Sequence, residues 1–431
     1  MMTKFVDDTF VEIVNISKPI PEHIQTKIDA YGNEVDPFFI GDLGDIINKH
    51  KKWSKCLPRV EPFYAVKCND LRPVIKLMSD MGLSFDCASK IEIEKVRNFG
   101  VDPSRIIYAN PCKQTSSLVH ARNNGVSLMT FDNEDELLKI KTVYPDARLV
   151  LRINTSPRYK VTVYLGKKFG CHHSKSSHLL EVAHELGLNV IGVSFHVGFG
   201  CQEIGAFEDA ICLARAVFEK GVNLGFNMYL LDIGGGIPGK EIPNFAFEKI
   251  AEGLNQSLDR HFPQRDVRII AEPGQYYVDS AFSVAVNIIG KRIDHDHSHD
   301  ERVNTKLPIG AKFMYYLNDG VHGNFYLAGR DPGRYVPLHF KNDPCLYSSS
   351  VWGPTCDSFD LIHENIQLPE HNVGEWLYFS NMGAYTFTIS TSFNNMQTVK
   401  QNFICDRNLW EEVYKYDKAV NTPDRENREK F

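Results

Sequence analysis

The segment PFYAVKCN, residues 62–69, places Lys67 at the end of a short apolar run. Phe63 to Val66 have the composition of a buried β-strand. A lysine at the end of a buried strand is desolvated, which lowers its pKa and favours the neutral, nucleophilic amine that covalent catalysis requires. The alternative is an exposed lysine whose aliphatic stem packs on apolar neighbours. The segment alone does not distinguish a nucleophilic lysine from an exposed one, so the rest of the sequence is needed to decide.

Strand-like runs of the same kind recur along residues 38–282 and alternate with helical stretches. The runs are PFYAVK, LSFDCA, RIIYAN, SLMTF, ARLVLRI, VIGVSFHV, YLLDIGGG and VRIIAEPG. Eight strands in one α/β series fit a (β/α)8 barrel better than an open sheet. The polar motifs stand at the carboxyl ends of these runs, where the active sites of such barrels gather. We therefore predict a barrel over residues 38–282.

After residue 283 the sequence pattern changes to runs of aromatic and β-branched residues separated by turns. The predicted strands there are FMYYLND, NFYLAG, LYSSSVWGP, EWLYFSN and YTFTISTSF. Residues 1–37 contain several prolines and are expected to form strand and turn. The predicted class is α/β: a barrel followed by an all-β C-terminal domain, in which residues 1–37 join residues 283–431.

Composition excludes several classes of function. A chain of 431 residues with 43% hydrophobic residues can bury the cores of two domains. Its net charge of −6 gives no reason to expect a nucleic-acid partner. It contains no apolar run long enough to span a membrane, and its first residues carry acids where a signal peptide would carry bases. We expect a cytoplasmic protein that neither enters membranes nor binds nucleic acid.

The cysteines and histidines do not predict a metal site. Ten cysteines without a CxxC pair indicate reduced thiols. The histidines of DHDHSHD (His295, His297 and His299) alternate in a polar loop, and His172 and His173 are merely adjacent. Such histidines bind metals adventitiously, so we assign no metal.

Further motifs follow PFYAVKCN in a fixed order. They are FDCASK (85–90), HVGFG (196–200), LLDIGGGIPG (230–239), EPGQYYV (272–278), WGPTCD (352–357) and NMGAY (381–385). Together they resemble the eukaryotic ornithine decarboxylase family, whose members bind pyridoxal 5'-phosphate. The resemblance extends from about residue 35 to 410. It implies an amino-acid decarboxylase with a barrel like that of alanine racemase.

The resemblance assigns roles around the cofactor. Lys67 matches the family's Schiff-base lysine, Glu272 the acid that pairs with the pyridine nitrogen, and His196 the histidine stacked on the ring. Without these motifs, Glu272 would be a turn cap and His196 a hydrogen-bonded core residue. The remaining matches to cofactor contacts are Gly234, Gly235, Gly236, Pro273, Gly274 and Tyr385. A glycine run after a barrel's seventh strand suits a phosphate, because its backbone N–H groups can approach the anion.

Residues far along the chain match substrate contacts. Cys356 matches the residue that returns a proton to the carbanion, and Asp357 and Asp331 match the acids that receive the distal ammonium of the substrate. In the family, such residues reach the site from the partner subunit, which implies a homodimer with two shared sites. Lys168 and Asp360 match a pair that bridges subunits.

The chain departs from the family at the phosphate. Phe199 stands where the family has serine, and Gln275 where it has arginine. Each loss of a charge-assisted hydrogen bond removes about 1.5–3 kcal/mol. Without compensation, the two together weaken cofactor binding by roughly a hundredfold to ten-thousandfold. Gln275 retains the capacity to donate one hydrogen bond.

The chain also departs from the family at the substrate. Arg330-Asp331 replaces a tyrosine-aspartate pair, Gly329, Pro332 and Gly333 reshape the turn, and His322 replaces a tyrosine. One interpretation is drift in a loop. In the other, Arg330 turns inward and pairs with Asp331 or Asp357, which cancels the charge that attracts a diamino acid. Ornithine is then disfavoured and a neutral aliphatic amino acid such as leucine is permitted.

Three hypotheses follow from these residues: an active decarboxylase, a non-catalytic relative of the antizyme inhibitors in polyamine metabolism, and a different reaction on the same cofactor. The conserved match of Lys67 and Cys356 favours the first, whereas the changes at Phe199 and Gln275 favour the second. In residues 113–139, which resemble the antizyme-binding region, Val119 replaces a family lysine, which argues against antizyme as a partner. The short polar tail also lacks the family's degradation signal.

Overall fold

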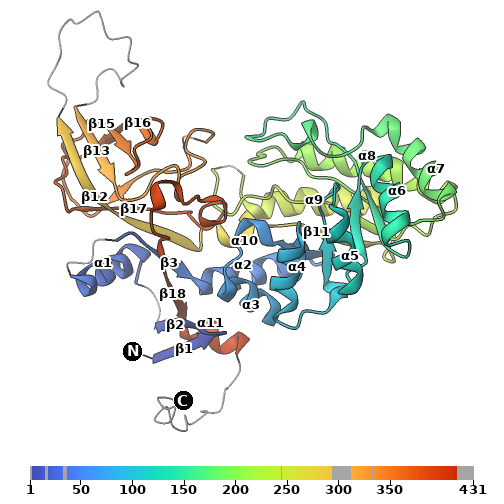
Figure 1. The fold of residues 1–431 in the computed structure, drawn as a ribbon, viewed down its shortest axis with the longest axis horizontal. Helices are drawn as coiled ribbons and strands as arrows, with labels where there is room; N and C mark the ends of the chain where they lie inside the picture. Colours follow the sequence, from blue (N-terminus) through green and yellow to red (C-terminus); the bar gives the residue numbers. More distant parts are fainter. Residues whose placement is uncertain are drawn as a thin grey trace, which may run out of the picture.

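The computed structural model describes residues 2–14, 18–32, 36–243, 245–293, 312–331 and 333–414. His295, His297, His299, Pro332 and the C-terminal tail lie outside the described residues. Within these ranges, a closed barrel and a mixed sheet lie side by side (Figure 1).

The barrel consists of the eight predicted runs. Its parallel strands are β4 (Val60–Ala65), β5 (Ser84–Cys87), β6 (Ile106–Tyr108), β7 (Leu128–Phe131), β8 (Arg148–Arg152), β9 (Asn189–Ser194), β10 (Leu230–Asp232) and β11 (Arg268–Ala271). The barrel closes because β11 pairs with β4 and β10 with β9. Its interior is filled by one apolar side chain from nearly every strand: Phe63, Ile107, Leu128, Val150, Ile191, Leu230 and Ile270. The predicted barrel is therefore confirmed.

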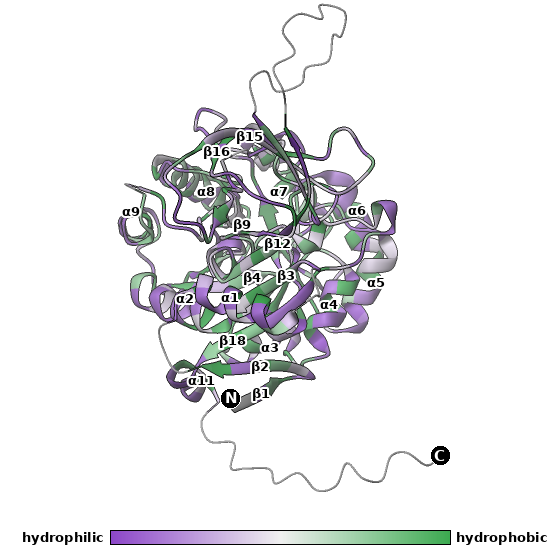
Figure 2. Ribbon diagram, turned by 90° about the vertical axis from the view of Figure 1, so that its left-hand side faces the viewer, coloured by the Kyte–Doolittle hydropathy of each residue, from purple (hydrophilic) through white to green (hydrophobic). Residues whose placement is uncertain are grey.

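Amphipathic helices cover the outside of the barrel. They are α2 (Leu43–Cys56), α3 (Arg72–Asp80), α4 (Lys90–Arg97), α5 (Thr115–Asn123), α6 (Glu134–Val143), α7 (Ser176–Glu185), α8 (Gly205–Asn223) and α9 (Phe247–His261). Figure 2 shows hydrophobic colour on the central strands and hydrophilic colour on much of the surrounding helices. Helix α4 begins with a capping box, in which Ser89 accepts the N–H of Glu92 at 3.2 Å and Glu92 accepts the N–H of Ala88 at 2.6 Å. These caps fix the loops at the carboxyl ends of the strands.

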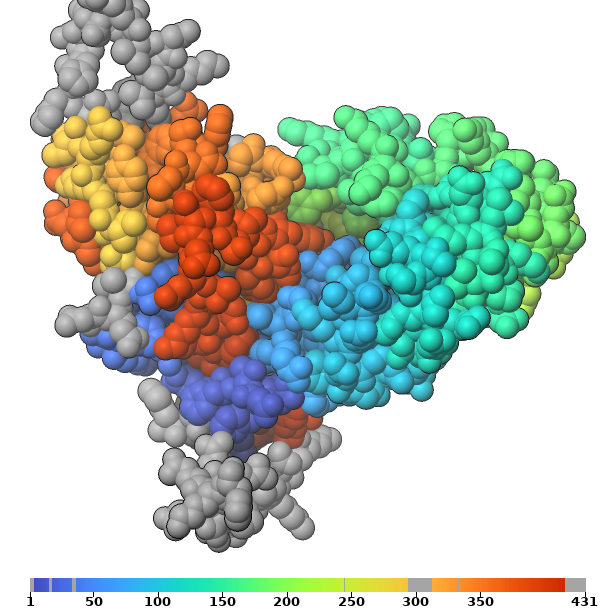
Figure 3. Space-filling model, in the orientation of Figure 1, coloured from blue at the N-terminus to red at the C-terminus, as the bar shows by residue number. Residues whose placement is uncertain are grey.

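The second sheet gathers segments from both ends of the chain. Its order is β1 (Met2–Val6), β2 (Thr9–Val14), β18 (Lys400–Asp406), β3 (Phe38–Asp42), β12 (Phe282–Ile293), β13 (Phe313–Leu317), β15 (Tyr347–Trp352) and β16 (Leu361–Leu368). β17 (Trp376–Phe379) pairs with β12 and with β14 (Leu338–His339). Residue 38, the expected start of the barrel, begins β3 and thus lies in this sheet. In Figure 3 the C-terminal segments, drawn in red and orange, lie directly against the barrel.

Three local expectations were wrong. Residues 20–31, expected as turn, form helix α1 (Ile20–Tyr31), which Pro19 and Pro21 start rather than break because their fixed φ suits a first turn. Residues 324–329 form successive turns and residues 385–393 form short 3-10 segments in place of the expected strands. Helix α11 (Arg407–Val413) ends the described chain.

Candidate active site

A cavity of about 560 Å³ opens at the carboxyl ends of the barrel strands. The barrel provides most of its wall, including Lys67, Arg152 and His196, and the mixed-sheet half adds residues 326, 327, 330, 385 and 389. The wall is largely apolar. The cavity thus lies where the two halves of the molecule meet. Of the residues that the sequence singled out, those that line it are Lys67, His196, Phe199, Gly236, Glu272, Gly274, Gln275, Arg330 and Tyr385.

Lys67 lies in a 3-10 turn directly after β4, and its amine reaches the cavity. Its Nζ forms an ion pair with Asp86, a fully buried carboxylate of β5. Burial by itself would lower the pKa of Lys67, but the charges of Asp86 and Glu272 outweigh burial and raise this pKa above its usual value. The expectation of a lowered pKa was therefore wrong, because the sequence did not reveal the carboxylate beside the amine. Lys67 is a charged lysine until a ligand displaces Asp86.

Glu272 follows β11 and lines the same cavity. It is 7% exposed, and its N–H donates to the carbonyl oxygen of Gly234 at 2.7 Å. Burial, together with the neighbouring Asp232 and Asp86, raises the pKa of Glu272 well above its usual value. The carbonyl of Pro273 accepts the N–H of Ala65 at 3.2 Å, which ties the Glu272 turn to the strand that leads to Lys67.

His196 follows β9 and faces the cavity. Its Nδ1 accepts the N–H of Gly198 at 3.0 Å, so the proton of the neutral ring is on Nε2. Burial and the positive charges of Arg152 and Lys67 lower the pKa of His196 well below its usual value. A neutral, fixed imidazole is suited to stack on an aromatic ring.

The glycine run after β10 packs too tightly for side chains. A Cβ on Gly234 would lie 2.1 Å from the carbonyl oxygen of Phe195. Gly236 has a φ of +96°, and a Cβ on it would lie 2.6 Å from the carbonyl oxygen of Gly198. Gly235 would similarly meet the carbonyl oxygen of Glu272 at 2.6 Å. Only glycine allows this close approach of backbone to backbone, and Gly236 lines the cavity.

The two family departures lie together at this end of the cavity. Phe199, Gln275 and Tyr385 all line it, and the rings of Phe199 and Tyr385 meet edge to face at 5.8 Å. Tyr385 has a positive φ of 52°, and its N–H donates to the carbonyl oxygen of Cys68 at 3.0 Å, beside Lys67. Gly274, which precedes Gln275, would meet Cys68 at 2.8 Å with a Cβ. The sequence-predicted cofactor contacts thus form one continuous surface.

A buried arginine stands behind this surface. Arg334 donates from Nη2 to Asp279 at 2.7 Å and to the carbonyl oxygen of Ala384 at 2.8 Å, and its guanidinium lies 5.9 Å from the ring of Phe199. The ion pair is nearly inaccessible to solvent, because both side chains are 3% exposed. Arg334 therefore fixes the segment that carries Tyr385.

Arg330 does not form the expected acid pair. Its guanidinium lies over the ring of Tyr326 at 5.1 Å, and Nη2 donates to the Tyr326 hydroxyl at 3.3 Å. Both residues line the cavity, whereas Asp331 does not. Within one chain Arg330 pairs with neither acid, because the aromatic ring four residues away already holds the cation. Its pairing with Asp357 of the partner subunit stays a prediction.

Asp357 is paired by a different residue. It accepts from His322 Nε2 at 2.7 Å, and the imidazole of His322 stacks on Phe393 with centroids 4.5 Å apart. Hydrogen bonds from the Phe359 N–H and from His322 lower the pKa of Asp357 below its usual value. Asp357 and the exposed Cys356 lie in the loop between β15 and β16 and do not line the Lys67 cavity of their own chain.

The bridge between subunits through Lys168 and Asp360 stays a prediction. Asp360 is 1% exposed, and its two oxygens accept the N–H of Val321 at 2.7 Å and the hydroxyl of Thr355 at 2.6 Å. Lys168 lies over the ring of Phe169.

Arg152, which lines the cavity, and the buried Asp86 and Asp232 were not predicted from the sequence. Asp86, Arg152 and Asp232 stand at the ends of apolar runs that we did identify, so a charged residue closing a barrel strand is the signal that could have revealed them. Ala109, Asn110 and Pro111 also line the cavity.

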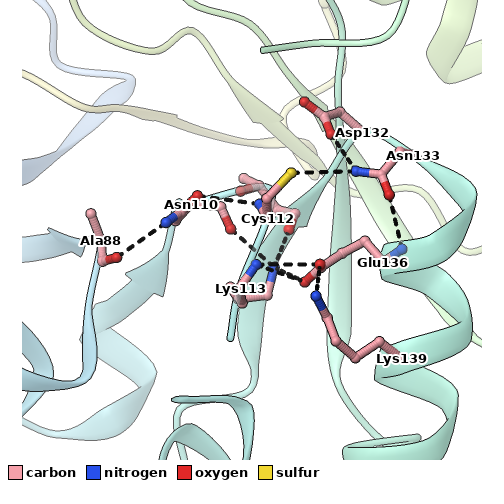
Figure 4. A network of polar contacts seen from close by, with 9 residues as sticks. Ala88, Asn110, Cys112, Lys113, Asp132, Asn133, Glu136 and Lys139 are labelled. Carbon is pink, nitrogen blue, oxygen red and sulfur yellow. Dashed lines mark hydrogen bonds and ion pairs between the residues drawn. The ribbon is translucent and has the colours of Figure 1, made fainter. Parts of the chain in front are cut away.

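A buried lysine, Lys113, holds the loop of residues 109–111 (Figure 4). Lys113 Nζ donates to the carbonyl oxygens of Asn110 at 3.1 Å and Thr130 at 2.6 Å, and it pairs with Glu136 at 3.0 Å. Lys113 and Glu136 have side chains 0% and 1% exposed, and Lys139 pairs with Glu136 from the partly exposed side at 2.6 Å. The network fixes one wall of the cavity.

No group of three or more potential metal ligands is arranged to hold an ion in the ranges that the structure describes. Among the helices of the same ranges, none is long and apolar enough to cross a membrane. All ten cysteines are free thiols.

Comparison with known proteins places this cavity in a family. Residues 43–279 match the family model described as the pyridoxal-binding domain of pyridoxal-dependent decarboxylases. The chain is 48% identical over 427 residues to antizyme inhibitor 2 of Xenopus laevis, covering 98% of this chain and 92% of that protein. It is 48% identical over 386 residues to ornithine decarboxylase of Rattus norvegicus, covering 88% and 83% of the two chains.

Solved structures agree. The arginine decarboxylase of Paramecium bursaria Chlorella virus superposes with a TM-score of 0.82 at 33% identity, covering 89% of this chain and 100% of that one. The lysine/ornithine decarboxylase of Vibrio vulnificus, complexed with cadaverine, gives 0.77 at 29% identity, covering 90% and 99%. The chain belongs to the pyridoxal-dependent decarboxylase family as a relative of the ornithine decarboxylases, and its cofactor is pyridoxal phosphate.

Proposed function

We propose that this protein is an amino-acid decarboxylase that acts through pyridoxal phosphate bound in the Lys67 cavity. The observation that carries the proposal is the convergence of Lys67, His196, Glu272 and Gly236, the last glycine of the run, in one cavity.

The cavity fits the cofactor. Its amine, Lys67, lies beside the carboxylates of Asp86 and Glu272, while the glycine run and Tyr385 lie at the Phe199 end. Asp86 Oδ1 is buried without a hydrogen-bond partner among the described residues, so a donor from a ligand can satisfy it. Lys67 would hold the aldehyde end, and the amides of the glycine run, Gln275 and Tyr385 would hold the phosphate.

The bound cofactor supplies an electron-withdrawing ring that accepts the electron pair of the breaking bond to the carboxyl group. Glu272 would stabilise positive charge at the ring nitrogen, and His196, a neutral imidazole, would pack against the ring. The apolar wall limits access of water, which strengthens these interactions. Asp86 holds Lys67 protonated and in place until the cofactor engages it.

Cys356 and Asp357 enter this scheme from a second subunit. Both lie on a loop outside the cavity of their own chain, and Phe359 of that loop is 83% exposed. We place Cys356 as proton donor and Asp357 as a substrate contact in the site of a homodimer partner.

The substrate that the wall favours is a neutral aliphatic amino acid such as leucine, with ornithine as the alternative. Arg330 puts a cation at the cavity, and Asp357 already accepts a hydrogen bond from His322. A substrate with a distal ammonium would be repelled by Arg330 and would compete with His322 for Asp357. Arg330 would repel the distal ammonium, and His322 already binds Asp357. These two effects replace the Arg330–acid pairing that the sequence suggested.

The test is to incubate the purified protein and pyridoxal phosphate with a panel of amino acids and to identify the amine formed. Formation of an amine together with carbon dioxide supports the proposal, and the identity of the amine names the substrate. Production of neither from ornithine, lysine, arginine or leucine would contradict it.

A second candidate is a non-catalytic regulator resembling antizyme inhibitor 2. The observation that favours it is the pair Phe199 and Gln275 at the phosphate end. Antizyme pull-down distinguishes the two, since a regulator would bind antizyme and form no amine. Val119, 37% exposed on α5, stands in the segment concerned and carries no charge for such a contact.

A further inference from the structure

Arg334 and Asp279 form an ion pair that is buried behind the phosphate end of the Lys67 cavity. Their side chains meet at 2.7 Å and are each 3% exposed, and neither residue lines the cavity. Arg334 Nε is also buried and finds no acceptor among the described residues. Removing two charges from water can cost more than their attraction returns, so a buried pair is a poor device for stability alone. The pair therefore calls for another role.

Asp279 connects one wall residue of the phosphate end to the segment that carries another. It directly follows α10 (Gln275–Val278), and its N–H donates to the carbonyl oxygen of Gln275 at 3.0 Å. Its own carbonyl oxygen accepts the N–H of Gly383 at 3.1 Å. Gly383 packs so closely that a Cβ on it would lie 1.6 Å from the carbonyl oxygen of Val278. Residues 382–385 are thus fixed against the end of α10.

Arg334 reaches the same place from a third segment of the chain. Its Nη2 donates to Asp279 Oδ1 at 2.7 Å and to the carbonyl oxygen of Ala384 at 2.8 Å. Ala384 directly precedes Tyr385, which lines the cavity. One guanidinium nitrogen therefore joins the end of α10 to the residue before Tyr385, and the positive charge strengthens both hydrogen bonds.

The backbone of Tyr385 needs such support. Its φ is +52°, in the left-handed region that residues with a side chain rarely adopt. A strained residue keeps its conformation only when the surrounding structure over-determines it, and such strain is typical of ligand clamps. The peptide unit between Ala384 and Tyr385 is held at both ends, because Arg334 binds its carbonyl oxygen and its N–H donates to the carbonyl oxygen of Cys68 at 3.0 Å. Loss of Arg334 would release one of these two ends.

We propose that Arg334 and Asp279 are positioning residues for cofactor binding: their ion pair holds the peptide before Tyr385 in the conformation that presents the Tyr385 side chain to the cofactor's phosphate. This role rests on the proposed function, because it presumes that pyridoxal phosphate binds in the Lys67 cavity. With two of the family's phosphate ligands replaced, the affinity depends strongly on the placement of the contacts that remain. Arg334 and Asp279 act through Tyr385 and do not touch the cofactor.

The first experiment is a double-mutant cycle on the dissociation constant of pyridoxal phosphate, measured by fluorescence titration of the full chain. Arg334→Met should weaken binding about tenfold in the parent and less than about twofold in Tyr385→Phe, because residues that act as a unit are not additive. The control is Asp319→Ala, which removes a buried aspartate of the mixed-sheet half that does not line the Lys67 cavity. It should leave the affinity unchanged in both backgrounds.

A paired variant covers the case in which the single substitution unfolds the protein. Arg334→Met alone leaves Asp279 buried without its partner, which is strongly destabilising. Arg334→Met combined with Asp279→Val removes both charges and leaves no isolated charge in the interior. Thermal unfolding of the cofactor-free protein should show this variant to be folded. It should also bind pyridoxal phosphate about tenfold more weakly than the parent, because the carbonyl oxygen of Ala384 has lost its donor.

The phosphorus NMR resonance of the bound cofactor separates the placement of Tyr385 from general stability. Its chemical shift responds to the hydrogen bonds and the ionisation of the phosphate. Arg334→Met and Tyr385→Phe should move this resonance in the same direction, since both remove the contact of the Tyr385 hydroxyl. Asp319→Ala should not move it.

An equal loss of affinity on Arg334→Met with and without the Tyr385 hydroxyl would overturn the role. So would a paired variant that binds as tightly as the parent, or a phosphorus resonance that only Tyr385→Phe moves. A parent that binds no pyridoxal phosphate contradicts both the proposed function and this role. A parent that binds the cofactor without coupling between Arg334 and Tyr385 contradicts this role alone.

Discussion

At the scale of single residues, the cavity combines the parts that hold a cofactor with two unusual side chains beside them. Phe199 and Gln275 remove polar contacts at the phosphate end, and Arg334 behind them is occupied by Asp279. In the proposed function, the phosphate would depend on backbone amides, Gln275 and Tyr385. Weak but sufficient cofactor binding is the expected consequence.

Gln275→Arg should tighten pyridoxal phosphate binding. A restored charge-assisted hydrogen bond contributes about 1.5–3 kcal/mol, which is roughly a 10- to 150-fold lower dissociation constant. The measurement is a cofactor titration, with Gln256→Arg on the exposed face of α9 as the matched control. Equal affinities of Gln275→Arg and the parent would show that position 275 does not reach the phosphate.

Arg330→Tyr should shift substrate choice toward ornithine. Removing the cation at the cavity removes its repulsion of a distal ammonium, so the ratio of kcat/KM for ornithine to that for leucine should rise by about tenfold, well within what polar pockets achieve. His322→Tyr should act in the same direction by freeing Asp357. A parent that strongly prefers ornithine, with no shift in either variant, would mean that neither side chain sets specificity.

At this scale, the sequence predicted some residues of the site and missed others. The glycine run, Lys67, Glu272 and His196 stand in long motifs and were found. The sequence did not reveal Asp86, Arg152 and Asp232, because the residues that they contact lie on neighbouring strands that are distant in the sequence. The partner of Lys67 reversed the expected direction of its pKa shift, and the partner of Arg330 was an aromatic ring four residues away.

At the scale of elements, the loop after β6 shows how distant helices shape the cavity. Lys113 is buried under the loop that carries Asn110 and joins it to β7 and α6 through Thr130 and Glu136. Its charge is compensated by one carboxylate and two carbonyl oxygens. Loss of the lysine would leave Glu136 with Lys139 alone.

Lys113→Met should lower the free energy of unfolding by about 3–5 kcal/mol, because Glu136 would lose its buried partner and keep only the partly exposed Lys139. Lys139→Met, at the partly exposed end of the same network, should cost less than about 1 kcal/mol. Urea denaturation measures both. Similar small losses in the two variants would show that the network contributes little.

The elements predicted correctly were those with a strong local period. The eight barrel strands were recognised because both faces of a parallel barrel strand are apolar. Residues 324–329 were misassigned because Asp319 accepts the N–H groups of Gly320 and Asn324 and bends the chain into turns that its aromatic composition hides. Strand β18 pairs in parallel with β2 and β3, nearly the whole chain length away, which no local pattern indicates.

At the scale of the whole molecule, one chain presents a cavity and, separately, a loop with exposed Cys356 and Phe359. The two belong to one site only if a second subunit supplies the loop. The proposed homodimer would then contain two sites, each built from both chains.

Mixing Lys67→Ala and Cys356→Ala subunits tests this arrangement. Each variant alone should be inactive or nearly so, and the mixture should recover about a quarter of the parent's activity, because half the dimers are mixed and each has one intact site. Subunit exchange is checked with differently tagged chains. Absence of recovery despite exchange would count against shared sites.

The central claim is that the Lys67 cavity decarboxylates amino acids with pyridoxal phosphate. The most direct measurement is release of carbon dioxide from carboxyl-labelled leucine and ornithine by the parent and by Lys67→Ala, both saturated with the cofactor. We predict release with an equimolar amount of amine from the parent and none from the variant. No release from either substrate, or equal release from both proteins, would contradict the claim.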